Sequence, residues 1–148
     1  MMQSPDTTPY PLTSYADIPP PLWRATSASV CGSSHLRLGL PCQDANYCLT
    51  TVNGALVGAV ADGAGSALFA EVGAGLAVHT AVESLLSCIE QEMPQTEREW
   101  KHLLSFAFQN ALEALTLEAR QRETELRELA TTLILIALTE KSVAVMQI

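Results

Sequence analysis

Positive charge is scarce in this sequence. Its 148 residues include eight Lys and Arg against sixteen Asp and Glu, which gives a formal net charge of -8. Because a nucleic-acid surface needs clustered basic side chains, the composition excludes nucleic acid from the expected partners. Hydrophobic residues make up 48% of the chain, which is enough for the buried core of one ordinary domain.

Long hydrophobic runs are also absent. The longest ones, residues 55–61 and 133–138, are far shorter than the roughly twenty residues that a membrane-spanning helix needs. No basic residue precedes Arg24, and the N-terminal region has no hydrophobic stretch, so a signal peptide is not expected. We therefore expect a cytoplasmic protein without membrane contacts.

The sequence has no C-x-x-C pair. Without a secretory signal, its cysteines are expected to be reduced and mostly buried thiols rather than disulfides. A sharper alternative is a zinc site, because Cys31, His35, Cys42 and Cys48 follow one another along the chain. Their C-x3-H-x6-C-x5-C spacing fits no common zinc module, so thiols are the favoured interpretation.

Composition divides the chain into two parts. Residues 1–22 hold six of the eight prolines and many small polar residues, which predicts a flexible Pro-rich leader. Residues 23–148 are expected to form one domain. The segment WRATSASV, residues 23–30, predicts a first strand, and the turn-forming residues after it predict a loop that reaches Asp44.

A hairpin is the clearest local pattern. Residues 45–52 and 55–61 are strand-like and are separated by Asn53-Gly54, the favoured pair for a type I′ turn. Asp44 just precedes the first strand and Asp62 just follows the second. Pairing across the turn therefore predicts that both carboxylates lie side by side at one end. Because like charges at close range cannot both stay ionised without a cation, this end is a candidate cation site.

The residues after Asp62 fit such a site. Mg²⁺ and Mn²⁺ bind carboxylates, backbone carbonyls and water, and a glycine at 63 lets the backbone carbonyl face an ion. A helix is predicted from Ser66 to about Glu90. The alternative interpretation is that Asp62 merely caps this helix, and spacing alone does not decide between the two.

The remaining elements complete an α+β pattern. Thr96 to Glu99 is a capping-box sequence that opens a second helix after Pro94. Residues 130–138 predict a buried strand, and residues 143–148 predict a further strand after a short turn. The expected order is a strand, a hairpin, two helices and a second hairpin.

Three segments together carry a family resemblance: GLPCQDA at 39–45, VADGAGS at 60–66 and ATTL at 130–133. This series resembles the first half of a metal-dependent serine/threonine phosphatase of the PP2C (PPM) family, in its bacterial-type branch. The resemblance covers about residues 23–148. It implies a PP2C-like β-sandwich flanked by helices in α-β-β-α layers, of which this chain would be the N-terminal half, and two Mg²⁺ or Mn²⁺ ions at one end of the complete domain.

The resemblance also implies roles for single residues. Asp62 matches the aspartate that bridges both ions, and Gly63 matches the position whose carbonyl contacts one ion. Asp44 matches the acid of the Glu/Gln-Asp-Ala motif, which supports the second ion partly through water. The implied reaction is hydrolysis of phosphoserine or phosphothreonine in a phosphorylated protein substrate by water that the cations acidify, with Asp62 and Asp44 as the catalytic acids.

The sequence departs from the family pattern at several places. Ala64 stands where some members have a histidine that protonates the leaving group. Gly39 stands where a phosphate-binding arginine is common; Arg37 is a nearby candidate for phosphate binding, although a solvated surface arginine is the favoured interpretation. In the family, a strand such as 143–148 leads to a Gly-Asp-Gly turn and a later metal-binding aspartate, but no Asp follows Asp62.

These departures predict a phosphatase domain truncated at its C-terminal side, with little activity by itself. The main alternative is a non-catalytic PP2C-like regulatory or binding module. A nucleotide-binding βα unit is less favoured, because Leu68 occupies the third glycine position of G-x-G-x-x-G and no Walker lysine follows.

Overall fold

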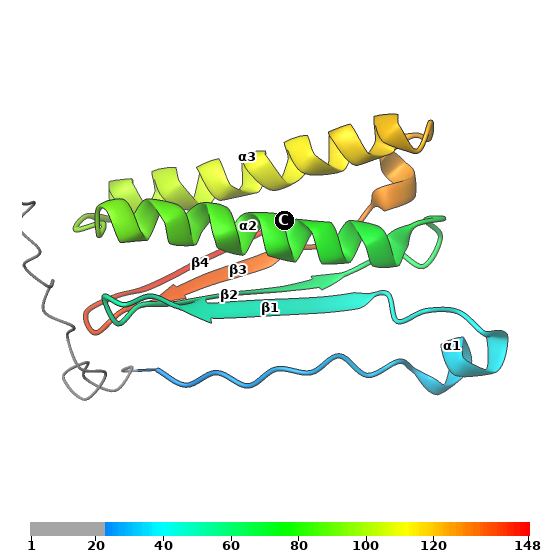
Figure 1. Cartoon of the computed structure of the whole chain (residues 1–148), viewed down its shortest axis with the longest axis horizontal. Helices are drawn as coiled ribbons and strands as arrows, with labels where there is room; N and C mark the ends of the chain where they lie inside the picture. The colour runs from blue at the N-terminus through cyan, green and yellow to red at the C-terminus, as the bar shows by residue number, and fades with distance from the viewer. Residues whose placement is uncertain (1–22) are drawn as a thin grey trace, which may run out of the picture.

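A computed structural model describes residues 23–148, so the predicted leader 1–22 lies outside the described residues. Figure 1 shows a sheet with two long helices lying on one face. In chain order the elements are α1 (Ser33–Leu38), β1 (Asp44–Thr50), β2 (Leu56–Asp62), α2 (Ala70–Gln91), α3 (Glu97–Gln121), η2 (Leu126–Leu129), β3 (Ile134–Leu138) and β4 (Val143–Gln147).

The strands form one four-stranded antiparallel sheet in the order β1-β2-β3-β4. Helix α2 contacts β1 and β2, and α3 contacts α2 and β4. The predicted α+β class is confirmed. Within the described residues there is one sheet and one layer of helices, so these residues form two of the four layers that the resemblance implied.

Small apolar residues bring the helices close to the sheet. Val57, Ala59 and Ala61 of β2 belong to the buried core and are at most 5% exposed. Gly73 of α2 lies so close to η2 that an added Cβ would collide with the Leu129 carbonyl. Such close contacts pack the start of α2 tightly against η2, and the small side chains of β2 let the helix layer pack on this face of the sheet.

The other face of the sheet is open and partly apolar. Alternate strand positions point away from the helices, and among them Val60 is 51% exposed, Ile134 41%, Val143 69% and Val145 55%. These exposures show that side chains on three adjacent strands, β2, β3 and β4, meet solvent on this face. Helices therefore cover the sheet on one side only within the described residues.

The first hairpin forms as predicted, but its turn differs. A type I′ turn needs positive φ at both central residues, whereas Gly54 has φ 78° and Asn53 is not among the described residues with positive φ. Thr51 N–H donates to the Ala55 carbonyl at 2.8 Å, so the loop has three residues, and Gly54 N–H closes the turn on the Thr51 carbonyl at 3.1 Å. The predicted type I′ turn is wrong because the Thr51 hydroxyl also accepts the Ala55 N–H, at 2.9 Å, which favours the longer loop.

Two further predictions are wrong. Residues 23–30 form no strand, because they have no ladder partner among the described residues. They run extended, and within residues 23–148 one side-chain hydrogen bond joins them to the sheet, from Asn46 Nδ2 to Ser29 Oγ at 2.6 Å. The predicted loop that follows contains the short helix α1, whose last turn ends at Gly39 with φ 68°.

Helix α2 is also long and apolar enough to cross a membrane, and it is the only such helix in the described part of the chain, with a mean hydropathy of 1.5 over its most apolar window. Its buried residues pack on β1, β2 and α3. The core helix of a soluble protein meets the same criterion, so this finding is weak evidence for a membrane span.

Candidate metal centre

Asp44 and Asp62 lie opposite each other across the first hairpin. Asp44 is the first residue of β1, Asp62 is the last residue of β2, and the two are direct partners in the antiparallel ladder. Side chains of such partners point to the same face, with Cβ atoms about 5 Å apart. Both residues are exposed. The predicted juxtaposition is confirmed, whereas the metal-binding and catalytic roles remain predictions.

The acid pair opens on a cleft on the face of the sheet that the helices leave free. The cleft has a volume of about 580 Å³ and lies between the sheet and the extended segment 26–30. Asn46, Thr132 and Ile134 contribute to its lining beside the two acids. In Figure 1 this extended segment runs below the sheet, on the side away from α2 and α3. A ligand can therefore reach both carboxylates from solvent.

Gly63 is placed where no side chain fits. A Cβ there would lie 2.5 Å from the Ala70 carbonyl oxygen and 2.9 Å from the Gln43 carbonyl oxygen. Gly63 N–H donates to the Gln43 carbonyl at 3.0 Å. Because the N–H and C=O of a strand residue point to the same side, the Gly63 carbonyl also faces the side of Gln43 and Asp44. The Gly63 carbonyl therefore lies on the β1 side of its own strand, at the same end of the hairpin as the two acids.

This donor set fits a hard divalent cation. Two carboxylates and one backbone carbonyl are oxygen ligands of the kind that Mg²⁺ and Mn²⁺ prefer, and Mg²⁺ usually keeps several waters. Asp44, Asp62 and Gly63 are the residues that would hold the ion. No group of three or more His, Cys, Asp or Glu side chains gathers within residues 23–148, so water would complete the coordination.

The zinc alternative is wrong. Cys31, His35, Cys42 and Cys48 do not come together as a metal-binding group in residues 23–148. The Cys31 thiol donates to the Leu40 carbonyl at 3.8 Å, and the Cys42 thiol donates to the Asp44 carbonyl at 3.7 Å, so both make local contacts. All four cysteines are free, and they are half-buried rather than mostly buried.

Comparison with known proteins decides the family. A family model described as Protein phosphatase 2C matches residues 31–148. The chain belongs to the protein phosphatase 2C family. No curated protein and no solved structure matches it significantly. The resemblance in the sequence is therefore confirmed at the level of the family, and the bacterial-type branch remains a prediction. Membership of this family suggests a phosphatase. The family is generally dependent on Mg²⁺ or Mn²⁺.

In this PP2C chain, Asp62 does not cap a helix. Helix α2 begins at Ala70, and its N-cap is Phe69, which makes no side-chain cap bond. The predicted start at Ser66 is wrong because the preceding N–H groups bond to a distant segment. Phe69 N–H donates to the Glu128 carbonyl at 2.8 Å, and Leu68 N–H donates to the Glu128 carboxylate at 2.9 Å. These bonds hold the loop after Asp62 in a non-helical conformation.

Arg37 is not among the residues that line the cleft of the acid pair. It is exposed on α1, and its Nε donates to the Ser33 carbonyl of the same helix at 3.2 Å. Helix α1 lies at the same end of the molecule as the start of β1 (Figure 1). Within residues 23–148 no Lys or Arg side chain lines the cleft of the acid pair. A phosphate-binding role for Arg37 therefore remains a prediction.

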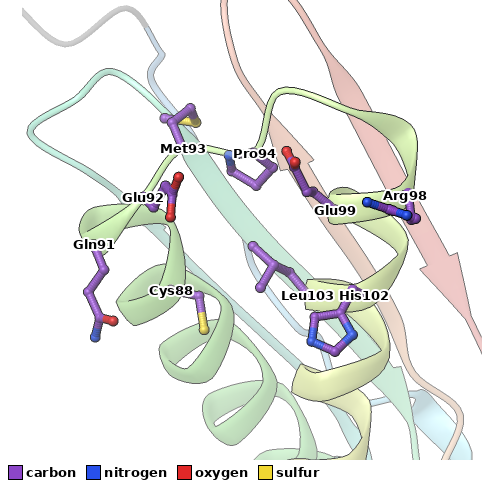
Figure 2. A pocket seen from close by; sticks show the side chains of 9 residues that line it. All are labelled: Cys88, Gln91, Glu92, Met93, Pro94, Arg98, Glu99, His102 and Leu103. Carbon is purple, nitrogen blue, oxygen red and sulfur yellow. The ribbon is translucent and has the colours of Figure 1, made fainter.

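A second groove lies at the other end of the helices. Figure 2 shows it between the end of α2 and the start of α3, with a volume of about 610 Å³ and walls that include Cys88, Met93, Arg98, Glu99, His102 and Leu103. Since α2 begins beside Gly63 and has 22 residues, the groove is about 30 Å from the acid pair.

This groove is poorly suited to the phosphoryl group that a PP2C enzyme binds. Gln95 and Thr96 N–H groups donate to the Glu99 carboxylate at 2.7 and 3.1 Å, and these bonds, with Gln95 first, lower the pKa of Glu99. The capping box thus fills the start of α3 with the chain's own carboxylate, at the place where an anion would otherwise bind.

Thr132 is the site residue whose role sequence reasoning missed. The sequence pointed to it only as part of the ATTL segment, inside the predicted strand 130–138, whereas the observed strand β3 begins at Ile134. In the structure its hydroxyl accepts the Asp62 N–H at 3.0 Å, and its own N–H donates to the Asp62 carbonyl at 2.9 Å. Nothing local in the sequence connects the two residues, which are 70 positions apart.

Proposed function

We propose that this chain carries metal-binding carboxylates of a PP2C phosphatase that hydrolyses phosphoserine or phosphothreonine in proteins. The observation that supports this most directly is the pairing of Asp44 with Asp62 on one face of the sheet, at the edge of a cleft open to solvent. The proposal also includes two divalent ions, as in the complete domain, and a cytoplasmic phosphoprotein as the substrate.

The charges around the cleft support a cation-dependent reaction. The side chains that line it include two carboxylates and, within the described residues, no basic group, so without cations it would repel a phosphate ester. When bound, Mg²⁺ or Mn²⁺ would supply acidified water and neutralise the phosphoryl oxygens. Asp44, Asp62 and the Gly63 carbonyl would hold the ions. Thr26, Ser27 and Ser29, whose side chains carry hydroxyl groups, line the cleft on the opposite side.

The shape of the cleft supports a peptide substrate. One wall is the extended segment 26–30, and the floor is the free face of the sheet, so the cleft is an open groove rather than an enclosed cavity. An extended peptide can lie along such a groove, whereas a small metabolite is better held in a pocket that surrounds it. We therefore favour a phosphorylated protein over a free phosphorylated metabolite.

A non-catalytic PP2C-like module is the second candidate. Within residues 23–148 the acid pair has no third acidic ligand, and no basic residue lines its cleft. A chain that folds like a phosphatase and binds metal weakly would suit a regulatory or binding role. This alternative predicts Mn²⁺ binding without any turnover.

The deciding experiment measures Mn²⁺ binding and phosphatase activity on the same samples. We expect residues 1–148 to bind Mn²⁺ and to hydrolyse a phosphothreonine peptide weakly, because two carboxylates are few for two ions. Asp62→Asn and Asp44→Asn should each weaken Mn²⁺ binding at least tenfold, a typical size for loss of a metal-site contact. Glu113→Gln removes the same charge from an exposed position on α3 and should change neither measurement.

Three outcomes separate the candidates. Weak turnover that EDTA abolishes, together with loss of Mn²⁺ binding in both Asp variants, supports the phosphatase. Mn²⁺ binding at the acid pair with no detectable turnover favours the non-catalytic module. If Asp44→Asn and Asp62→Asn bind Mn²⁺ as tightly as the wild type, the metal centre is wrong.

A further inference from the structure

We propose that Thr132 is a positioning residue that sets the backbone of Asp62 and thereby the affinity of the acid pair for a divalent cation. The metal part of this inference rests on the proposed function. The structural part rests on an irregularity in the hydrogen bonds between β2 and the segment that leads into β3.

The irregularity lies in an otherwise continuous ladder. The pairs from Leu56↔Leu138 to Val60↔Ile134 are regular, and the bridge between Gly63 and Thr131 keeps the same register beyond them. In this register Asp62 and Thr132 stand opposite each other. Two residues at such a position normally exchange two backbone bonds, one from each N–H to the opposite carbonyl.

Only one of those two bonds is present. Thr132 N–H donates to the Asp62 carbonyl at 2.9 Å, as in a regular ladder. Asp62 N–H donates at 3.0 Å to the Thr132 hydroxyl instead of the Thr132 carbonyl. That carbonyl accepts a different bond, from the Thr131 hydroxyl at 3.0 Å. The side chain of Thr132 has therefore replaced its own carbonyl as the partner of Asp62.

This arrangement holds the peptide groups on both sides of the Asp62 Cα atom. The Thr132 hydroxyl accepts from the Asp62 N–H and donates its own proton to the Asp62 carbonyl at 3.4 Å. Fixing both peptide groups restricts the backbone dihedrals of Asp62, and these determine where its carboxylate points. Thr132 also lines the same cleft as the acid pair. A residue that orients a metal ligand in this way typically changes metal affinity 10- to 100-fold when it is lost.

The alternative is that Thr132 only stabilises the sheet. In that case removal of its hydroxyl would lower stability but leave the Asp62 carboxylate where it is. The two roles differ in metal affinity measured on folded protein. They also differ in rescue by serine, since Ser keeps the hydroxyl and loses only the methyl group.

The test uses the whole chain and Mn²⁺ as the probe, with affinity measured by electron paramagnetic resonance. We expect Thr132→Val to weaken Mn²⁺ binding about tenfold, near the lower end of the range for such partners because the site is exposed. Thr132→Ser should stay within about twofold of the wild type. Thr116→Val is the matched control, because it removes a hydroxyl that bonds to the Leu112 carbonyl within α3.

A second measurement needs no metal. Amide hydrogen exchange in EDTA should be about tenfold faster for Asp62 in Thr132→Val than in the wild type or in Thr132→Ser, because the amide loses its acceptor. If Thr132→Val does not fold, Thr132→Ala takes its place with the same expected results, since it also lacks the hydroxyl.

The outcomes separate this inference from the proposed function. Faster Asp62 exchange with unchanged Mn²⁺ affinity in Thr132→Val overturns the positioning role and leaves the metal centre intact. A wild-type chain that shows no Mn²⁺ binding dependent on Asp62 overturns both. Weaker binding in Thr132→Val with recovery in Thr132→Ser supports the inference.

Discussion

The two ends of the first hairpin treat their polar groups in opposite ways. At the turn end Thr51 is 5% exposed, and its hydroxyl and N–H both bond to Ala55, at 2.9 and 2.8 Å. At the open end the carboxylates of Asp44 and Asp62 are exposed and make no hydrogen bond or ion pair within residues 23–148. At one end of the two strands the polar groups of Thr51 are all hydrogen-bonded, and at the other end two carboxylates have no partner within the described residues.

This difference separates a structural polar residue from a candidate ligand. Thr51 has all the partners that it needs within five residues, so its role is complete in the folded chain. The backbone around Asp62 is held tightly by Thr132 and by the close approach of Gly63 to Ala70, yet the carboxylate itself is left without a partner. A held backbone with a free charged group is typical of a prepared binding site.

The largest expected effect comes from Gly63, at the open end. Gly63→Ala should lower the free energy of unfolding by about 3 kcal/mol, because the added Cβ meets two backbone carbonyls that cannot turn aside. Urea unfolding of the metal-free chain measures the change. Gly75→Ala in α2 is the control, since a Cβ there has nothing within 4 Å and should add about 0.5 to 1 kcal/mol of stability.

A loss below about 1 kcal/mol for Gly63→Ala would mean that α2 can move away from β2 at this end. The backbone next to Asp62 would then not be rigid, which would contradict the proposed difference between the two ends of the hairpin.

A smaller effect is expected at the turn end. Thr51→Val removes the acceptor of the buried Ala55 N–H and should cost about 1.5 kcal/mol. It should leave Mn²⁺ affinity unchanged, because the turn and the acid pair are at opposite ends of the strands. Thr50→Val, at an exposed position next to it, should stay within about 0.5 kcal/mol of the wild type. A change in Mn²⁺ affinity in Thr51→Val would show that the two ends are coupled.

The smallest effect on stability is expected for Asp62→Asn. In EDTA the free energy of unfolding of the variant should be within about 0.5 kcal/mol of the wild-type value or slightly higher. The reason is that the substitution removes the repulsion between the Asp62 and Asp44 carboxylates. With Mn²⁺ at 100 times the wild-type dissociation constant, the wild type should gain about 2.7 kcal/mol, and a variant that binds at least tenfold more weakly should gain no more than about 1.4 kcal/mol. Melting temperatures with and without Mn²⁺ measure both quantities.

A clear drop in the stability of metal-free Asp62→Asn would contradict the difference between the open end and the turn end of the hairpin. It would show that the carboxylate already has a structural partner, and the open end would then resemble the turn end.

Predictions from the sequence succeeded where the physical cause is local. The capping box at Thr96 and Glu99 lies within one helical turn, and both of its bonds are present. The apolar run 55–61 and the short connection before it correctly predicted that β1 pairs with β2. The predicted strand at 23–30 failed because a strand needs a neighbour, and composition cannot supply one.

The predicted start of α2 failed for a related reason. Apolar periodicity begins near Ser66, but the N–H groups of Leu68 and Phe69 bond to Glu128, which is about 60 residues away in the chain. These N–H groups bond to Glu128 and are not part of a helix, and hydrophobic periodicity cannot predict a hydrogen bond to a distant residue.

The sequence by itself determined that Asp44 and Asp62 lie at the same end of one hairpin, because the two strands flank a short loop. Their direct pairing depends on the three-residue loop, since the predicted two-residue turn would have placed Asp44 opposite Gly63. It also carried enough ordered motifs to indicate the PP2C family. Only the tertiary structure decided that Gly63 has no space for a side chain and that Thr132 holds the backbone of Asp62. Those features depend on groups brought together across up to 70 residues by the packing of the helices and the sheet, and local propensity contains no record of that packing.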